Sequence, residues 1–90
     1  MTKTILTERF KKDIRSKVTS RRVYEEIKTK VKYLDIIPTM GSTDLPESII
    51  QTFGDGVRKL SNPPFLIIYE YDANTQTNTV YALIHERQAF

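Results

Sequence analysis

The sequence predicts a small α+β domain in which a hairpin of two helices packs on an antiparallel β-sheet. Two observations support this fold class. Apolar residues recur at helical spacing between residues 7 and 34, and β-branched and aromatic runs fill much of residues 63–90. Helical and strand segments are therefore segregated along the chain, which is typical of α+β domains. The expected order is strand, helix, helix, strand, strand, strand.

Length and composition predict one folded domain spanning residues 1–90. Hydrophobic residues make up 39% and charged residues 28%, in the range of folded proteins. The chain has no cysteine and one histidine, so we expect no disulfide, no metal site and no cofactor. No run approaches the ~20 apolar residues of a membrane span, and the N-terminal apolar stretch is too short for a signal peptide. The expected location is therefore the cytoplasm.

The net charge of +3 hides a marked asymmetry along the chain. Residues 1–34 hold 11 lysine and arginine residues against 4 acidic ones, whereas residues 35–90 hold 3 against 7. A basic half favours a polyanionic partner, either nucleic acid or an acidic protein segment. A solvated, lysine-rich helix face is the alternative interpretation.

The first half of the chain predicts a strand followed by two helices. A short strand is expected at residues 3–6, and Thr7 is a suitable N-cap for the first helix. Thr19 or Ser20 can cap the second helix. Because two or three residues join the helices, we expect an antiparallel hairpin. The apolar stripes that define the two helices are Phe10, Ile14 and Val18, then Val23, Tyr24, Ile27, Val31 and Leu34.

The second half predicts three strands, at residues 57–60, 65–71 and 79–85. The polar stretch 73–78 predicts a hairpin turn, and residues 65–71 are so apolar that this strand should be covered on both faces. Strict alternation would place Val80, Ala82 and Ile84 on one face of the last strand and Tyr81, Leu83 and His85 on the other. Residues 38–55 fit either a loop or a short helix near Pro46.

Three short motifs follow the two predicted helices: Gly56-Val-Arg-Lys-Leu60, Phe65-Leu-Ile-Ile-Tyr69 and Ala82-Leu-Ile-His-Glu-Arg-Gln88. In this order they resemble the RelE/ParE superfamily of bacterial type II toxins. The resemblance implies the toxin of a bacterial toxin–antitoxin pair, held inactive by the folding arm of a cognate antitoxin, with a role in plasmid stabilisation.

The superfamily contains two activities. RelE-like members cut mRNA on the ribosome, whereas ParE-like members inhibit DNA gyrase by binding and are not nucleases. Where RelE-like enzymes carry two arginines and a terminal tyrosine, this chain has Leu66, Glu86 and Phe90. RNA cleavage needs a base, a cation and a proton donor, and leucine and phenylalanine supply none of these. The chain therefore resembles ParE more closely, and this interpretation needs no catalytic residues.

Two alternatives stay open at this point, so the sequence does not decide whether the protein is an enzyme. One is a RelE-like ribosome-dependent endoribonuclease that uses Glu70, His85 and Arg87. The other is a non-toxic member that keeps only the fold and partner binding. Reporter-transcript cleavage and growth after induction would distinguish them.

The ParE resemblance implies two binding surfaces. Candidate target-binding residues are Arg58, Lys59, His85, Arg87 and Phe90. Candidate antitoxin-binding residues are Phe10, Ile14, Arg15, Arg22 and Lys28. We expect Arg58 and Arg87 to face a common patch; salt bridges to Asp55 or Glu86 are the alternative. For His85 the alternative is a structural hydrogen bond at the sheet edge.

Overall fold

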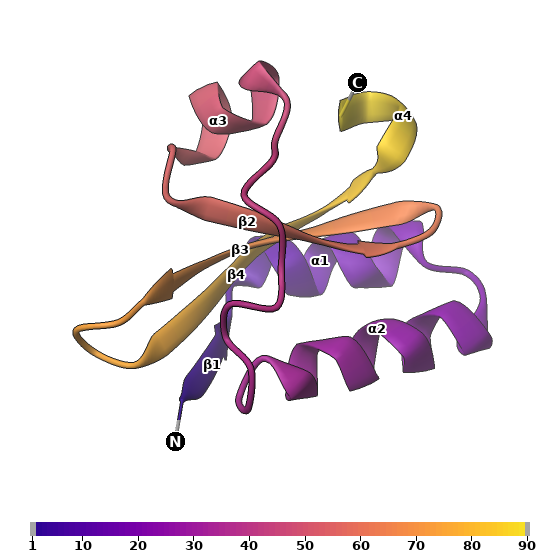
Figure 1. Ribbon diagram of the computed structural model, residues 1–90. Helices are drawn as coiled ribbons and strands as arrows, with labels where there is room; N and C mark the ends of the chain where they lie inside the picture. The colour runs from indigo at the N-terminus through magenta and orange to yellow at the C-terminus, as the bar shows by residue number, and fades with distance from the viewer. Residues whose placement is uncertain (1, 90) are drawn as a thin grey trace.

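The computed structural model describes residues 2–89 and confirms the predicted order of the six main elements (Figure 1). Two short helices are added, one inside the ambiguous segment and one at the end of the chain. Within residues 2–89, none of the helices is long and apolar enough to cross a membrane. The elements are β1 (Lys3–Leu6), α1 (Glu8–Lys17), α2 (Arg21–Tyr33), α3 (Glu47–Phe53), β2 (Val57–Asn62), β3 (Phe65–Asp72), β4 (Thr77–His85) and α4 (Glu86–Ala89).

The four strands form one mixed sheet with the order β1-β4-β3-β2. The antiparallel meander of β2, β3 and β4 is as predicted. The prediction of a wholly antiparallel sheet is wrong for β1, which pairs with β4 in parallel, from Lys3–Thr77 to Leu6–Val80. Four residues of β1 carry no local signal for a partner more than 70 positions away, so its direction could not be predicted from the sequence.

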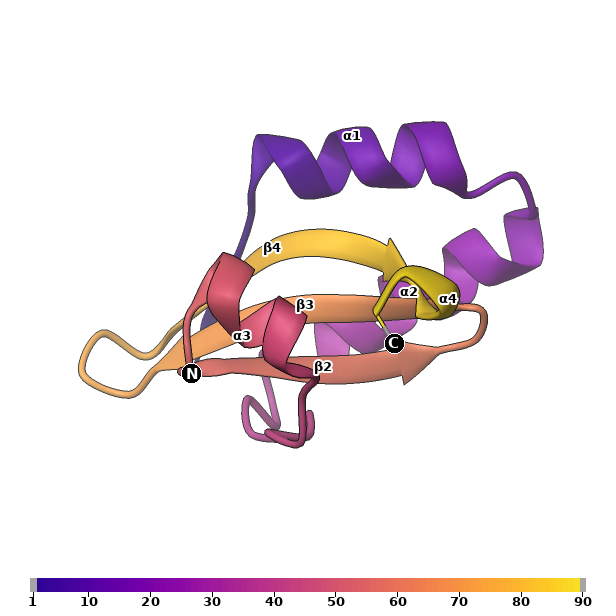
Figure 2. The ribbon, with the colours of Figure 1, turned by 90° about the horizontal axis from the view of Figure 1, so that it is seen from above.

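The helices α1 and α2 form the predicted antiparallel hairpin beneath one face of the sheet (Figures 1 and 2). Thr7 Oγ1 accepts a hydrogen bond from the backbone N–H of Phe10 at 3.2 Å, and Ser20 Oγ accepts one from Val23 at 3.3 Å. Both N-caps therefore satisfy amide groups that the helices leave unpaired.

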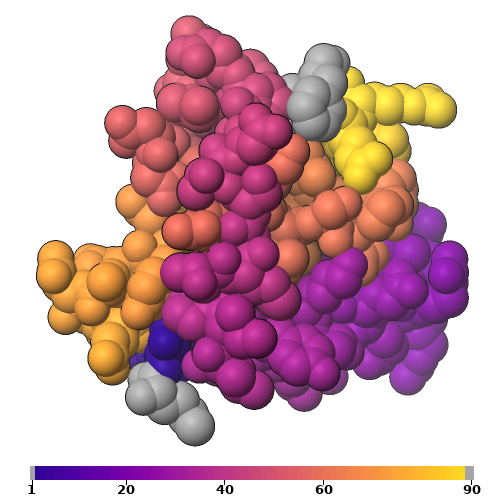
Figure 3. Space-filling view, viewed as in Figure 1, coloured from indigo at the N-terminus to yellow at the C-terminus, as the bar shows by residue number. Residues whose placement is uncertain are grey.

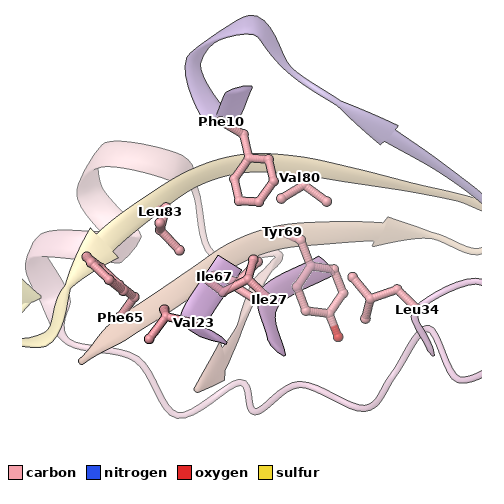
Figure 4. Packing of buried hydrophobic residues seen from close by; sticks show 9 residues of the cluster. All are labelled: Phe10, Val23, Ile27, Leu34, Phe65, Ile67, Tyr69, Val80 and Leu83. Carbon is pink, nitrogen blue, oxygen red and sulfur yellow. The ribbon is translucent and has the colours of Figure 1, made fainter. Parts of the chain in front are cut away.

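The main core lies between this hairpin and the sheet (Figure 4). Tyr69 is fully buried in it, so its ring is part of the core. The helices contribute Phe10, Val23, Ile27 and Leu34, and the strands contribute Phe65, Ile67, Tyr69, Val80 and Leu83.

A second core covers the opposite face of the sheet. Ile49 of α3 packs on Leu66 and Ile68 of β3 and on Ala82 and Ile84 of β4. The ambiguous segment thus contains a helix, at residues 47–53. Because a core lies on each side of the sheet, β3 is covered on both faces, as its apolar sequence predicted.

A β-bulge corrects the predicted alternation of β4. Ile68 pairs with Ala82 but Tyr69 pairs with Val80, so Tyr81 is the extra residue. One extra residue reverses the direction of every side chain before it. Val80 therefore joins Leu83 in the main core, whereas Tyr81 packs against the second core.

Residues 35–46 form a strap that runs from the end of α2 across β2 to α3 (Figure 3). Ser42 and Lys59 exchange two backbone hydrogen bonds, of 2.8 and 2.9 Å. The buried hydroxyl of Tyr69 donates to Pro38 O at 2.9 Å and accepts from the N–H of Gly41 at 2.8 Å. The strap thus pairs with part of an edge that would otherwise be exposed.

Candidate functional site

His85 ends β4 and makes two contacts that fix its ring. The ring lies edge-on to Phe65, with centroids 5.7 Å apart. Its Nδ1 atom accepts a hydrogen bond from the backbone N–H of Arg87 at 3.1 Å, which ties the strand to α4. Because Nδ1 is an acceptor, the proton of the neutral ring is assigned to Nε2, which is left as a donor.

An open hollow of about 440 Å³ lies beside His85. It is lined by Lys17, Phe65, His85, Arg87 and Gln88. Two predicted target-binding residues, His85 and Arg87, are thus brought together. Lys17 was missed by the sequence analysis, because it stands 68 positions earlier and only the packing of α1 on β4 brings it here.

Lys17 is held in place by the end of β4. Its Nζ atom donates to Leu83 O at 2.9 Å and lies 3.6 Å from Asp13 Oδ1. Asp13 Oδ2 in turn accepts from the N–H of Leu83 at 3.1 Å. These contacts leave about a third of the Lys17 side chain exposed (32%) at the rim of the hollow.

Arg58 lies away from this hollow. It stands opposite Tyr69, whereas His85 stands opposite Phe65, four residues and roughly 13 Å along β3. Arg58 Nη1 donates to Gly41 O at 3.0 Å and is 3.5 Å from Thr39 O. The expected common patch of Arg58 and Arg87 is therefore absent, and Arg58 anchors the strap.

The other predicted target-binding residues are also separated from His85. Lys59 stands opposite Ile68, on the face of the sheet that α3 covers, whereas His85 lies on the hairpin face with Phe65. Phe90 lies outside the described residues. Within residues 2–89, Arg87 forms no ion pair with Glu86, whose carboxylate accepts from Ser61 Oγ at 3.4 Å.

The three residues of the nuclease alternative do not converge. Glu70 lies five residues along β3 from the partner of His85, roughly 17 Å away. Its carboxylate accepts from Tyr81 Oη at 2.8 Å on the α3 side of the sheet. This hydrogen bond, with burial and the nearby negative charge, raises the pKa of Tyr81. Glu70 and His85 therefore cannot act on the same phosphate in this arrangement.

A separate apolar groove of about 280 Å³ runs between α1 and α2. Three of the predicted antitoxin-binding residues, Phe10, Ile14 and Lys28, line this groove. Arg15 and Arg22 do not, and Arg22 borders a hollow on the other side of α2. The groove residues that the sequence analysis did not assign to this surface are Leu6, Tyr24, Ile27, Val31 and Lys32.

The comparison with protein families decides between the related toxin families. The family model described as ParE toxin of type II toxin-antitoxin system, parDE, matches residues 4–90. The chain belongs to the ParE toxin family. It is thus a ParE-like toxin of a type II toxin–antitoxin system, as the motifs near its end indicated, and its family implies an antitoxin partner. No curated protein matches the chain.

Proposed function

We propose that this ParE-family toxin inhibits DNA gyrase by binding to it, and that a cognate antitoxin neutralises it. The family match over residues 4–90 is the observation that carries the proposal. Inhibition by binding needs a surface and no catalytic set.

The geometry of the described residues favours binding over RNA cleavage. The candidate base Glu70 is bonded to Tyr81 on the face opposite His85. Leu66, at the position of a RelE-like arginine, is buried against α3 and its neighbours. Among residues 2–89, Glu70 is therefore not in position to act as the base beside His85 and Arg87, as the nuclease alternative requires.

The proposed target surface is the hollow formed by Lys17, His85 and Arg87. Phe90, outside the described residues, stays a candidate from the sequence alone. Arg58 supports this surface only indirectly, through the strap. Lys59 would contribute from the other face of the sheet.

The proposed antitoxin site is the groove between α1 and α2. Leu6 and Tyr24 are 37% and 41% exposed there, which leaves apolar surface for a partner to bury. Lys28 and Lys32 also line the groove. The matching partner is an amphipathic segment with apolar side chains along its centre and acidic side chains beside them.

A gyrase cleavage assay tests the target. Purified toxin is incubated with gyrase, supercoiled plasmid and ATP, and covalent complexes are trapped with detergent and protease. We expect linear DNA that increases with toxin dose, and less of it with Arg87→Ala than with the exposed control Lys12→Ala. Absence of linear DNA, with gyrase active in the control, would remove gyrase as the target. Codon-phased cuts in a translated reporter transcript would then favour the ribosome-dependent nuclease.

A growth assay tests the antitoxin site. The toxin and the antitoxin encoded with it are induced from separate promoters. We expect Lys28→Glu together with Lys32→Glu to remain toxic but to escape rescue, because the acidic segment would be repelled. Equal rescue of this variant and the wild type would exclude the groove, and unaffected growth without antitoxin would favour a non-toxic member.

A further inference from the structure

Two connections of the fold and the helix α4 lie towards one end of the molecule. The α1–α2 connection, the β2–β3 turn and α4 all lie towards this end (Figures 1 and 2), and in Figure 1 the turn lies between the other two. This end carries basic side chains from three helices, which we call the basic end. They are Lys17 of α1, Arg21 and Arg22 of α2, and Arg87 of α4.

Two hollows place these cations on both sides of the β2–β3 turn. One contains Lys17 and Arg87 beside Phe65, and the other contains Arg22 beside Asn62. Asn62 and Phe65 face each other across the turn. Lys17, Arg22 and Arg87 therefore flank this turn, and the hollow with Arg22 also contains Glu25, Glu26 and Lys30.

Acidic neighbours neutralise only part of this charge. Asp13 lies 3.6 Å from Lys17, and Glu26 lies 3.7 Å from Arg22. Glu86 is bonded to Ser61, and Glu25 lies in the next turn of α2. Within residues 2–89, Arg21 and Arg87 form no ion pair and are exposed.

The start of α2 adds to the positive potential. Its first turn contains Arg21 and Arg22 and no acidic residue. Cations are unfavourable at the positive end of a helix dipole. An anion bound at this end would relieve that repulsion.

The composition of the basic end favours a nucleic acid over a protein partner. Large exposed apolar residues are found in β1, in the groove side of α2 and around the strap, at Ile5, Leu6, Tyr24, Tyr33, Ile36, Ile37 and Met40. They do not line the hollow with Lys17 and Arg87, whereas Tyr33 and Met40 line the hollow that contains Arg22. Protein interfaces concentrate apolar anchors, whereas nucleic-acid interfaces are more polar and strongly basic.

We propose that the basic end binds the phosphodiester backbone of a nucleic acid, which in the setting of gyrase inhibition is the DNA that gyrase holds. The inference rests on the proposed function for this choice of nucleic acid. Arg87 and Lys17 supply charged donors, and Nε2–H of His85 supplies a neutral one. The toxin would thus contact the enzyme's DNA as well as the enzyme.

The opposite end of the molecule carries acidic residues, which would help to direct the basic end towards DNA. Glu70 and Asp72 lie on β3 near the β3–β4 turn, and Asp35 accepts from Thr4 of the neighbouring β1. Negative charge at one end and positive charge at the other would turn the basic end towards a polyanion during encounter.

Fluorescence anisotropy with a labelled 20-base-pair DNA tests the inference directly. Affinity is measured between about 50 and 200 mM salt for the wild type, Arg21→Gln/Arg87→Gln and the control Lys11→Gln/Lys12→Gln. Both pairs remove two exposed charges. If each lost arginine contacts a phosphate, the salt slope should shrink by about 1.8. We expect affinity at low salt to fall at least about tenfold for the arginine pair and less than about threefold for the lysine pair.

Three results would overturn the site. The first is the absence of DNA binding at low salt. The second is an equal loss for both pairs, which would indicate diffuse attraction to net charge. The third is reduced binding of Arg21→Gln/Arg87→Gln to gyrase without DNA, with DNA affinity unchanged, which would assign the basic end to an acidic protein surface. Circular dichroism and urea unfolding of each variant verify that the fold is retained.

An RNA duplex of the same sequence distinguishes the two sources of phosphodiester. Tighter binding to DNA is expected. Tighter binding to RNA would keep the site but overturn gyrase-bound DNA as its ligand. The cleavage assay, run in parallel, separates this inference from the proposed function. If linear DNA forms but the basic end has no affinity for DNA, only the inference is overturned. If the basic end binds DNA but no linear DNA forms, only gyrase inhibition is overturned.

Discussion

Asp13 Oδ2 of α1 accepts a hydrogen bond of 3.1 Å from the backbone N–H of Leu83, at a point where β4 has no strand on the side away from β3. The parallel strand β1 pairs with β4 only as far as Val80. Beyond it, Thr7 Oγ1 donates to Val80 O and Tyr81 O at 2.8 and 3.1 Å, and Lys17 donates to Leu83 O. Polar side chains of α1 and its cap therefore replace the missing strand, which keeps the end of β4 extended towards His85.

Asp13→Ala should destabilise the protein by about 2 kcal/mol, because the buried N–H of Leu83 loses its acceptor. Asp13→Asn keeps an oxygen at that position and should cost less, although it weakens the contact with Lys17. The free energy of unfolding from urea titrations, followed by circular dichroism, measures both. If the two variants were equally destabilised, the charge of Asp13 and not its acceptor oxygen would be what stabilises β4.

Gly41→Ala should destabilise the strap, because a Cβ atom there would lie 2.7 Å from Lys59 O and from two atoms of Tyr69. Backbone and a fully buried ring cannot move away easily, so a loss of about 1–3 kcal/mol is expected. Gly56→Ala is the matched control, since its Cβ would meet only the carboxylate of Glu70, within 2.7 Å. A smaller loss for Gly56→Ala, measured by urea unfolding, is expected. The reverse order would show that the strap adapts.

Local signals explain why much of the fold was predictable. Thr7 and Ser20 have side chains that cap helices, and the apolar run from Phe65 to Tyr69 can lie only where both faces are covered. The bulge at Tyr81 and the parallel pairing of β1 depend on residues far away in the chain. No local pattern in this sequence encodes either, so strict alternation gave the wrong face for Val80.

The candidate site was only partly predictable for the same reason. His85 and Arg87 are two positions apart, so the sequence could group them. Lys17 lies beside His85 and Arg87 because α1 packs on β4. Arg58 lies away from them because β2 places it opposite Tyr69. The predicted shared patch required the start of β2, with Arg58, to lie near the end of β4, with Arg87. In the antiparallel meander these two points lie at opposite ends of the strands.

Stability should decrease at alkaline pH because of two tyrosines. Burial raises the pKa of Tyr69 despite opposing effects of Gly41 and Arg58, and the hydrogen bond to Glu70 raises the pKa of Tyr81. A raised pKa means that the folded state holds the proton more tightly than the unfolded state, in which the pKa of tyrosine is about 10. This contribution is complete below that pH and is lost as pH rises through the folded-state values.

Urea midpoints measured between about pH 8 and pH 11 would show this decrease. In Tyr81→Phe the urea midpoint should decrease less steeply with pH, because this variant lacks the phenol whose pKa is raised by folding. Tyr24→Phe, at an exposed tyrosine, should follow the wild type. Parallel curves for Tyr81→Phe and the wild type would show that this tyrosine does not cause the decrease.

Arg58→Ala should lower stability but leave gyrase inhibition intact. Arg87→Ala should leave stability nearly unchanged but reduce gyrase inhibition. Arg58 donates to carbonyl groups of the strap, so its loss should lower the free energy of unfolding by about 1–3 kcal/mol. The folded fraction should still trap gyrase on DNA, because the hollow beside His85 is intact. Arg87 is exposed, so its loss should change stability by less than about 0.5 kcal/mol but reduce the trapped complex. Urea unfolding and the cleavage assay on the same preparations measure both quantities. A folded Arg58→Ala protein that fails to trap gyrase would place Arg58 on the target surface after all, in spite of its distance from Arg87.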